Sequence, residues 1–504
     1  MRILLACKEM IAFERAAIMA LSSTLKRDGH EVKAVVIKSA EPLTSMKMVK
    51  DKVGKEGLEN PDGVFKIVSN FQPQVIGYSV MTGEHYDILD LNRRLKNSFN
   101  FISVMGGPHP TFNNQVIEED GIDAICTGEG DNSFPEFIRR IESGEDYWLT
   151  ETFHTKHNQK IYRNPLGKLI SDLNELPFPD RQVLYDADPN LANIGNKSFI
   201  TARGCPFKCT YCFNNQYNDN YKGLGQILRT RSPELVIEEI ERVKDDFPLD
   251  NVTFNDDIFI LRPSGWIKKF AKLYKRKIGL PFNITARPSV VKKEDIKTLK
   301  DCGLTYVWLG IECGDEEIAN KVFMRTTSNE TILKVAKWFH ENNVKIIALN
   351  IMGLPVDNPF EVDLRTIDLN LKIKPALFSC GLLYPFPGTA IAKIAIESGY
   401  FTEDDNTVYL ESNKHSSMLT FKSEKEKMMV ENAQKLGGIV VEFPFLRPFV
   451  RFLCSLPLTN FYHLLFYIHL GYCHKIRLNP PKIRNITKEL PVFWSYFRTL
   501  LRKT

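Results

Sequence analysis

Three cysteines within eight residues constrain this 504-residue chain more than any other feature. Cys205, Cys209 and Cys212 are spaced C-x₃-C-x₂-C, directly after the strand-like stretch 198–202. Three thiolates on one tight loop can hold three irons of a 4Fe–4S cube, since cysteine thiolate is the ligand that such clusters use. A fourth cysteine is missing nearby, so one iron would stay open to a substrate or cofactor. The spacing therefore predicts a cluster that has these three cysteines as its metal ligands.

Two other uses of these cysteines fit the sequence less well. A structural zinc site is closed by four protein ligands, and no fourth one is near. A disulfide pairing leaves one of three cysteines over, and no export signal is present. The other seven cysteines show no metal spacing, and we expect each to be a small core residue: Cys7, Cys126, Cys302, Cys313, Cys380, Cys454 and Cys473.

Length and composition predict two or three domains in a reducing cytoplasm. Hydrophobic residues make up 43% of the chain and charged residues 25%, as in soluble globular proteins. A chain of 504 residues is too long for one ordinary core. The net charge of +5 is small for this length, so we expect no nucleic acid partner. The segment Met1–Cys7 is typical of a buried strand rather than of a signal peptide.

Residues 1–146 predict an α/β fold, a doubly wound parallel sheet of the Rossmann-like kind, because strand-like and helix-like segments alternate there. Ligands of such sheets bind at the carboxyl ends of the strands. Three loops at those ends contain glycines, which let a backbone approach a ligand closely. We expect strands at Arg2–Ala6, Val32–Ile37, Gln74–Val80, Phe101–Met105 and Ile122–Cys126, and helices at Glu14–Lys26, Asp87–Lys96 and Ser133–Ile141.

Residues 147–197 are polar and punctuated by prolines, which predicts a linker. Residues 198–392 then resume the alternation of strands and helices. Six such units predict a partial (β/α)₆ barrel of the TIM type, whose active face is the carboxyl end of its strands. We expect strands at Ser198–Ala202, Val252–Phe254, Phe282–Ala286, Tyr306–Ile311, Lys345–Ile351 and Ala376–Leu383, and helices at Pro233–Lys244, Ser264–Lys275, Lys293–Asp301, Glu330–Asn342 and Phe360–Leu371.

Polar or turn-forming residues end five of these strands. Asp256 and Asp257 are adjacent acceptors that point in different directions, so we expect one of them to face the site and favour Asp256, although aspartate also caps helices readily. Arg287 suits a carboxylate as a bidentate donor, and Glu312 could pair with it in an ordinary ion pair. Gly353 lies in a Gly-x-Pro turn. Tyr384 could line a substrate pocket, or be hydrogen-bonded for structural reasons only.

Residues 393–504 predict a helical C-terminal region with a helix at Glu424–Leu436. Residues 443–504 contain ten Lys and Arg but one acid, Glu489. The apolar stretch Leu456–Tyr472 is interrupted and falls short of the roughly 20 residues that a spanning helix needs. Basic and aromatic residues together suit an interfacial helix on an anionic membrane. A cap packed on the barrel is an equally good interpretation.

The cysteine string, with aromatic Tyr211 before the last cysteine, resembles the radical S-adenosylmethionine (SAM) enzymes. Over roughly residues 1–400 the chain is similar to the class B methyltransferase-like branch, which carries a cobalamin-binding domain in front. The resemblance implies that the open iron binds SAM, and that an electron from a donor such as flavodoxin or ferredoxin cleaves it to a 5′-deoxyadenosyl radical.

The resemblance also implies roles for individual residues. Cys205, Cys209, Cys212 and Tyr384 would be catalytic, and Asp256, Arg287 and Glu312 would contact the amino group, the carboxylate and the ribose or amino acid part of SAM. Further cofactor contacts would come from Tyr211 and Gly353 for SAM, and from Thr82, Gly83, Gly106, Gly107, His109, Gly128 and Glu129 for cobalamin.

One departure from many cobalamin proteins concerns the first loop. The motif Asp-x-His-x-x-Gly, whose histidine ligates cobalt, is replaced here by Cys7-Lys8-Glu9-Met10-Ile11. The resembling branch commonly lacks the motif too. We therefore expect cobalamin to bind without a histidine from this loop. His109 beside its glycine turn is more typical of a hydrogen-bonding loop residue than of a cobalt ligand.

The resulting hypothesis is a cobalamin-dependent radical SAM enzyme that methylates an unactivated carbon or phosphorus of a small or lipid-like substrate. We expect it in the cytoplasm or at the inner face of the cell membrane. A cyclase or rearrangement enzyme of the same branch is the main alternative. A tRNA methylthiotransferase would need three further cluster cysteines in its first domain, which here holds only Cys7 and Cys126. A cobalamin or iron sensor would not need polar residues at several strand ends.

Overall fold

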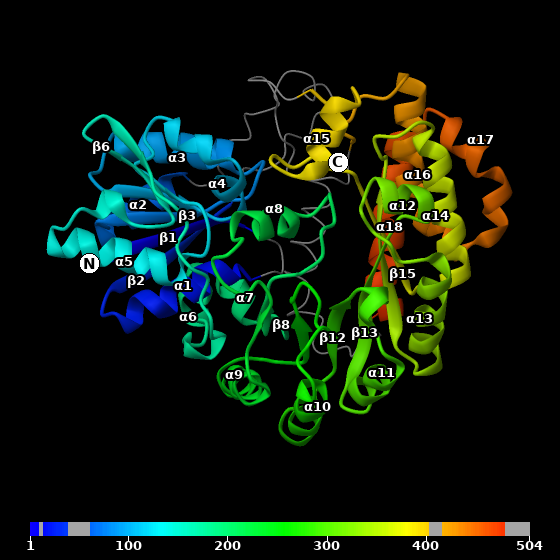
Figure 1. Cartoon of the computed structure of the whole chain (residues 1–504), viewed down its shortest axis with the longest axis horizontal. Helices are drawn as coiled ribbons and strands as arrows, with labels where there is room; N and C mark the ends of the chain where they lie inside the picture. Colours follow the sequence, from blue (N-terminus) through cyan, green and yellow to red (C-terminus); the bar gives the residue numbers. More distant parts are fainter. Residues whose placement is uncertain (10–13, 39–60, 403–415, 479–504) are drawn as a thin grey trace. The chain divides into compact units, whose positions relative to one another are not determined.

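The computed structural model describes residues 1–9, 14–38, 61–402 and 416–478. The chain forms two compact units (Figure 1), of which the first contains Met1–Ile194 and Tyr217–Arg229 and the second contains Gly195–Gln216 and the described chain from Thr230 onward. The two units are considered separately below.

The first unit is built on a seven-stranded sheet with the order β2-β1-β3-β4-β5-β6-β7. The first five strands pair in parallel, and β6 and β7 are antiparallel. Six residues of β1 in a row are buried, as expected for a parallel strand covered on both faces. The strands are β1 Arg2–Lys8, β2 Glu31–Ile37, β3 Val75–Ser79, β4 Ile102–Gly106, β5 Ala124–Cys126, β6 Phe153–His157 and β7 Lys160–Arg163.

Within residues 1–146, the helices α2 and α4 were not predicted from the sequence. A helix predicted at 14–26 is found as α1, and those predicted at 87–96 and 133–141 are found as α3 and α5. The helices are α1 Ala16–Arg27, α2 Pro61–Phe71, α3 His85–Lys96, α4 Pro108–Phe112, η1 Asn114–Glu118, α5 Gly130–Ser143, η2 Tyr147–Leu149, η3 Leu173–Glu175, α6 Arg181–Ala187 and α7 Pro189–Ala192. The predicted doubly wound domain is confirmed.

The range 147–197, predicted as a linker, instead contributes to the first unit. Its strands β6 and β7 extend the sheet beyond β5, and α6 packs against α1 and β2. The buried ion pair between Arg181 and Glu14, at 2.8 Å, fastens α6 to the segment before α1. The prolines that suggested a linker occupy the loop between η3 and α6.

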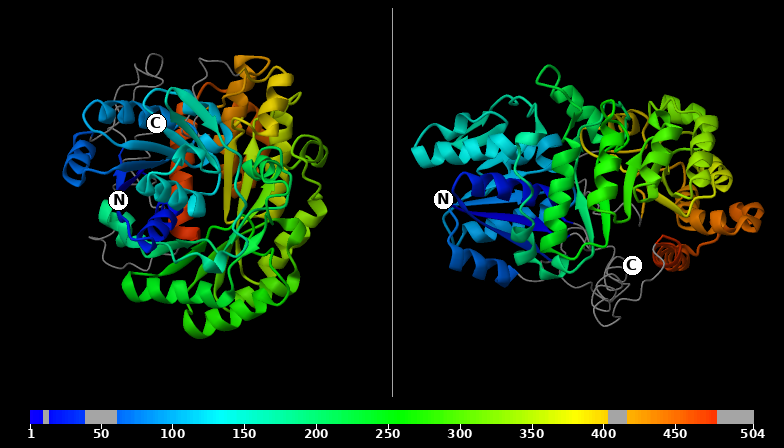
Figure 2. Two further views of the ribbon diagram at one scale, coloured as in Figure 1. Left: turned by 60° about the vertical axis from the view of Figure 1, so that its left-hand side comes forward. Right: turned by 90° about the horizontal axis from the view of Figure 1, so that it is seen from below.

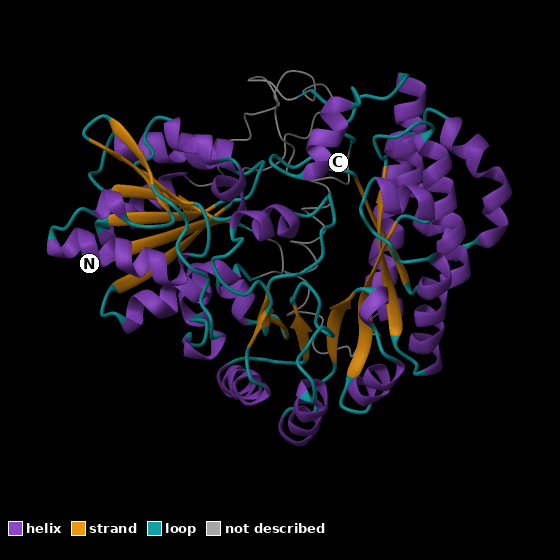
Figure 3. Cartoon of the chain, viewed as in Figure 1, coloured by secondary structure: helices purple, strands orange, loops and turns teal. Residues whose placement is uncertain are grey.

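The second unit is a six-stranded, all-parallel sheet with the order β15-β14-β13-β12-β11-β8. The sheet curls as an open half-barrel, with helices along its outer side (Figure 3). This is the predicted partial barrel. Its strands are β8 Asn196–Phe199, β11 Asn251–Phe254, β12 Phe282–Ala286, β13 Leu304–Glu312, β14 Lys345–Met352 and β15 Leu377–Leu382, while β9 Ala202–Arg203 and β10 Arg229–Thr230 form a separate pair.

The helices of the half-barrel follow from recognisable signals. Ser232 caps α9 by accepting a hydrogen bond from the Leu235 amide, and Pro233 occupies the first helical position, as predicted. All the helices of the half-barrel follow in the order of the chain. They are α8 Phe213–Asn220, α9 Pro233–Asp246, α10 Trp266–Lys277, η4 Pro288–Val290, α11 Lys293–Lys300, α12 Glu316–Lys321, α13 Asn329–Glu341, α14 Pro359–Ile373 and α15 Ala390–Glu397.

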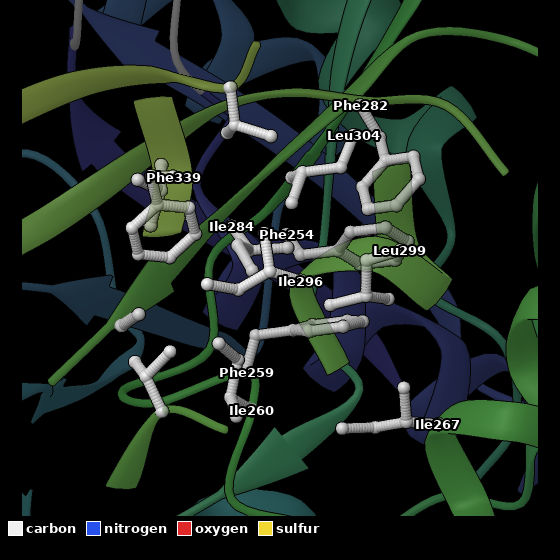
Figure 4. Close-up of a cluster of buried hydrophobic side chains, with 14 of the residues drawn as sticks. Phe254, Phe259, Ile260, Ile267, Phe282, Ile284, Ile296, Leu299, Leu304 and Phe339 are labelled. Atoms are coloured by element: carbon white, nitrogen blue, oxygen red, sulfur yellow. The ribbon is translucent and has the colours of Figure 1, made fainter. Parts of the chain in front are cut away.

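An aromatic core lies between the sheet and these helices. Phe254, Phe259 and Phe282 are fully buried (Figure 4): Phe254 packs edge to face on Phe282, with 5.6 Å between ring centroids, and makes a tilted contact with Phe259 at 4.8 Å. Full burial of one such side chain is worth about 2 to 3 kcal/mol. The core therefore fixes β11 and β12, the strands whose carboxyl ends contain Asp256 and Arg287.

Helix α16, Glu424–Glu442, covers β15 at the edge of the half-barrel. It runs six residues beyond its predicted end at Leu436, through Gly437 and Gly438. A Cβ atom at Gly437 would lie 2.8 Å from the Phe378 ring, so glycine lets the helix pack closely on the strand. Packing on β15 thus overrides the helix-ending tendency of two glycines.

The chain continues into short helical segments. Three of them pack on α16: η5 Pro444–Phe449, α17 Val450–Ser455 and α18 Thr459–Tyr472; the last, η6 Cys473–Leu478, packs on α18 and β15. They lie at one end of the second unit, in orange and red in Figure 2. Among the described helices, none is long and apolar enough to cross a membrane. The basic and aromatic stretch predicted at 443–504 is described as far as residue 478, and residues 479–504 lie outside the described residues.

Candidate active site

The cysteine loop leaves β9 through Gly204, whose φ of 88° is left-handed and favours glycine. Arg287, directly after β12, contacts this loop at two side chains. Its Nη1 donates to the Cys209 sulfur at 3.1 Å, and its guanidinium lies 4.0 Å from the centre of the Phe207 ring. The predicted strand-end arginine therefore binds the cysteine loop itself and places a positive charge beside the Cys209 sulfur.

The three cysteine sulfurs are not gathered as the ligands of a single ion would be. In the described part of the chain, they are not a group whose ligand atoms all lie within 4.8 Å of one another, as one zinc ion would require. Burial raises the pKa of Cys205 to about 11 and that of Cys212 to about 12. Cys205 and Cys212 would have to lose these protons to bind a metal, and the Arg287 charge favours that loss at Cys205.

Glu312 lies at the end of β13 with a φ of 67°, an uncommon conformation for a residue other than glycine. Its carboxylate pairs with Arg325 at 3.7 Å, and Arg325 also contacts the Tyr211 hydroxyl at 3.4 Å and donates to the Gly310 carbonyl. Burial raises the pKa of Glu312, and the Arg325 charge opposes that shift. These contacts bring together two predicted residues, Glu312 and Tyr211, beside the last cysteines.

Arg325 was not predicted from the sequence. It lies in the loop after α12, away from any strand end, and no motif marks it. The ion pair suggested between Glu312 and Arg287 is formed by Arg325 instead, while Arg287 binds the cysteine loop.

Asp256 and Asp257 have different surroundings. Asp256 is buried, and its carboxylate accepts from the Thr201 amide at 2.6 Å and the Ala202 amide at 2.8 Å, and pairs with Arg262. These contacts fasten the end of β8 and leave it little capacity for a ligand. Asp257 is exposed and accepts from Asn214 at 2.9 Å. The arrangement favours Asp257 over the predicted Asp256 as the carboxylate that faces the cysteine loop.

The last two strand ends are packed tightly. Gly353 has a φ of 70°, and its amide donates to the buried Asp363 carboxylate at 3.1 Å. Burial raises the pKa of Asp363 to about 8. Tyr384 is buried and its ring stacks on Phe386 with 4.2 Å between centroids. Both residues shape the loops above β14 and β15, as expected for either a pocket lining or a structural role.

In the first unit, three of the predicted loops follow the neighbouring strands β3, β4 and β5. Gly107 has a φ of 101°, and a Cβ there would lie 2.9 Å from the Val80 carbonyl oxygen, so only glycine fits. His109 is buried and stacks on His85 at 3.8 Å between ring centroids, with its Nδ1 3.3 Å from the Thr82 hydroxyl. Burial lowers the pKa of His109 to about 4.

Glu129, predicted to contact cobalamin, is instead engaged by protein groups. Its carboxylate forms a bidentate ion pair with Arg229, at 2.7 and 2.9 Å, and accepts from the Tyr217 hydroxyl at 3.0 Å. A Cβ at Gly128 would lie 2.0 Å from the Tyr221 hydroxyl. This loop therefore binds the segment Tyr217–Arg229, which follows the last cluster cysteine.

The first loop, at the end of β1, contains ion pairs in place of the missing histidine. Lys8 pairs with Asp87 at 2.6 Å, and Arg15 pairs with Glu84 at 2.5 Å. Both acids belong to the start of α3 or precede it directly. Residues 10–13, which complete the predicted loop, lie outside the described residues.

Family models match two parts of the chain. Residues 199–365 match the model of the radical SAM superfamily, and residues 3–138 match the model of the B12 binding domain. An uncharacterized methyltransferase of Pyrococcus horikoshii is 26% identical over 388 residues, covering 75% of this chain and 78% of the relative. The hopanoid C-3 methylase of Methylococcus capsulatus is 20% identical, covering 76% of this chain and 68% of the relative.

Among solved structures, the cobalamin-dependent SAM radical enzyme OxsB, with aqua-cobalamin bound, superposes with a TM-score of 0.67. The sequence identity is 16%, and the match covers 99% of this chain and 80% of that one. At this identity the likeness shows a shared fold.

Proposed function

The chain is a radical SAM protein with an N-terminal B12-binding domain, and on that premise we propose that it methylates an unactivated carbon or phosphorus centre. The observation that carries the proposal is the cysteine loop with its strand-end residues Arg287 and Glu312 in the same chain as a B12-binding domain. When bound, the cluster supplies the electron that cleaves SAM, and cobalamin supplies the methyl carrier.

The protein residues have separate tasks in this proposal. Cys205, Cys209 and Cys212 hold three irons and leave the fourth open. Arg287 binds the loop at Cys209, so the loop keeps its shape when the metal is bound. Glu312, oriented by Arg325, offers a carboxylate to the hydroxyl or ammonium groups of SAM, and burial makes that charge-assisted hydrogen bond strong.

The loops after β3, β4 and β5 would hold cobalamin. Gly107 keeps its backbone close to Val80 at the carboxyl end of the strands, where ligands of doubly wound sheets bind. The Thr82 and Gly83 loop lies beside it. Because His109 is buried and its ring stacks on His85, we propose that it has a structural role and does not ligate cobalt.

The substrate class remains part of the proposal. We favour an apolar, lipid-like substrate, because the relative from Methylococcus capsulatus is named a hopanoid methylase and the C-terminal region is apolar and basic. We further propose a flavodoxin or ferredoxin as reductant, and attachment to the inner face of the cell membrane through the C-terminal region.

Methyl transfer can be separated from cyclisation or rearrangement with SAM that carries a deuterated methyl group. In a single turnover of the reconstituted full chain, methyl transfer gives 5′-deoxyadenosine, S-adenosylhomocysteine and a product heavier by one labelled methyl group. A cyclase gives 5′-deoxyadenosine with no label in the product. The second result would replace methylation by the alternative within the branch.

A further inference from the structure

Exposed apolar side chains concentrate in one part of the described chain. Fifteen large hydrophobic side chains are exposed in the described residues, and ten of them lie between 443 and 476. Their exposed fractions run from 43% to 70%. We call this set the apolar surface: Phe443, Phe445, Phe449, Phe452, Leu458, Phe461, Leu464, Ile468, Tyr472 and Ile476.

On α18 and η6 the exposed residues form a stripe. Phe461, Leu464, Ile468 and Tyr472 follow one another at intervals of three, four and four residues, and Ile476 comes four later. That spacing puts the α18 members on one face of the helix. The face turned toward the protein contains Tyr462 and Phe466, which are buried.

Helix α18 is therefore apolar on both sides. One side packs on α16, and the other presents the stripe to its surroundings. A helix that is hydrophobic all round is normally buried, in a core or in lipid. A monomeric soluble protein seldom exposes apolar patches larger than a few hundred Å². The stripe thus requires a second apolar partner.

The charges around the apolar surface indicate what that partner is. Between residues 443 and 488 the sequence has no acid, and residues 479–504 contain six Lys and Arg against Glu489. The excess of basic residues complements an anionic partner. Five phenylalanines and Tyr472 suit the water–hydrocarbon boundary of a bilayer.

Arginines next to the apolar surface are held by the protein. Arg447 pairs with Asp368 at 2.5 and 2.7 Å, and Arg451 pairs with Glu361. These arginines are partly neutralised, so their pull on lipid headgroups is reduced. Contact of this surface with lipid must then depend chiefly on burial of the aromatic side chains, which salt does not screen.

We propose that the apolar surface inserts into one leaflet of an anionic bilayer, with α18 lying on the membrane rather than crossing it. At 14 residues α18 is too short to span a bilayer. The inference rests on the proposed apolar substrate for its purpose. Its test does not, because vesicle binding needs neither turnover nor substrate.

The experiment is flotation of the reconstituted full chain with vesicles of phosphatidylcholine and phosphatidylglycerol. A triple variant of the α18 stripe, Phe461→Ser, Ile468→Ser and Tyr472→Ser, is compared with a double variant, Arg447→Gln and Arg451→Gln. Because all three side chains of the stripe are exposed, the triple variant should keep its fold, and circular dichroism with cobalamin content verifies this. We expect the triple variant to bind at least tenfold more weakly, and the arginine variant less than threefold.

Salt gives a second reading. At about 1 M salt, where the Debye length is about 3 Å, the parent should keep more than half of its vesicle binding. Binding by the triple variant equal to that of the parent would overturn the proposal. A parent protein that does not float with vesicles would also overturn it. The same holds if light scattering shows that the parent is a dimer, that the triple variant is a monomer, and that neither binds vesicles. SAM cleavage, measured separately, tests the proposed function.

Discussion

Replacing Glu129 by Gln tests whether the loop after β5 anchors the segment Tyr217–Arg229. The substitution keeps the size of the side chain and removes its charge. Arg229 is then left buried, with 2% of its side chain exposed, and without its carboxylate. Breaking a buried ion pair by removing one partner typically costs about 3 to 5 kcal/mol. Because Glu129 is 16% exposed, we expect the lower end, about 3 kcal/mol.

Hydrogen exchange followed by mass spectrometry measures this directly on peptides from 213–230. A loss of about 3 kcal/mol corresponds to roughly 100-fold faster exchange of the protected amides in that segment. The matched control is Glu145→Gln, which removes an exposed carboxylate paired with Arg139 and should leave the exchange of peptides from 213–230 unchanged.

A double variant, Glu129→Leu with Arg229→Met, separates the ion pair from the packing. Buried ion pairs replaced by apolar side chains of similar size are often neutral in stability. We therefore expect the double variant to recover at least half of the loss. If the amides of 213–230 exchange at the same rate in Glu129→Gln as in the Glu145→Gln control, the Glu129 carboxylate does not hold this segment. The result would then favour the predicted contact of Glu129 with cobalamin.

Four further predictions follow from the site. Cys209→Ala should lower the bound iron and abolish 5′-deoxyadenosine formation; wild-type levels of either would contradict the ligand assignment. Glu312→Gln should weaken SAM binding by at least tenfold, measured by calorimetry, with the iron content unchanged. Asp363, whose pKa is raised to about 8, binds its proton more tightly when folded, so it lowers stability as pH rises from about 4 to 8. Asp363→Asn should remove that slope in urea titrations. In the electron paramagnetic resonance spectrum of the cob(II)alamin form, we expect no splitting from a His109 nitrogen, so His109→Gln should leave the spectrum unchanged.

Much of the fold follows from the sequence because parallel strands leave a strong pattern. The buried runs of β1, β13 and β14 predict their strands directly, and Ser232 with Pro233 predicts where α9 begins. The order of the strands follows from their alternation with helices. The hairpin of β6 and β7 was missed, since its short strands lie in a polar, proline-containing range whose pairing depends on the distant β5.

The site was predicted less completely. The spacing of Cys205, Cys209 and Cys212 is local, so the sequence could reveal it. The partner of Glu312 could not be found this way, because Arg325 reaches it from a loop without a motif. Asp256 and Asp257 are adjacent in sequence, and only the contacts with Thr201, Ala202 and Arg262 distinguish the buried carboxylate from the exposed one.

The central claim is that one chain combines reductive SAM cleavage with bound cobalamin. The most direct measurement is anaerobic incubation of the reconstituted full chain with SAM and a low-potential reductant, followed by quantification of 5′-deoxyadenosine and of cobalamin that stays with the protein. We predict 5′-deoxyadenosine in excess over enzyme and close to one cobalamin per chain. A chain that retains its iron but forms no 5′-deoxyadenosine, or that forms it with no cobalamin bound, would contradict the account.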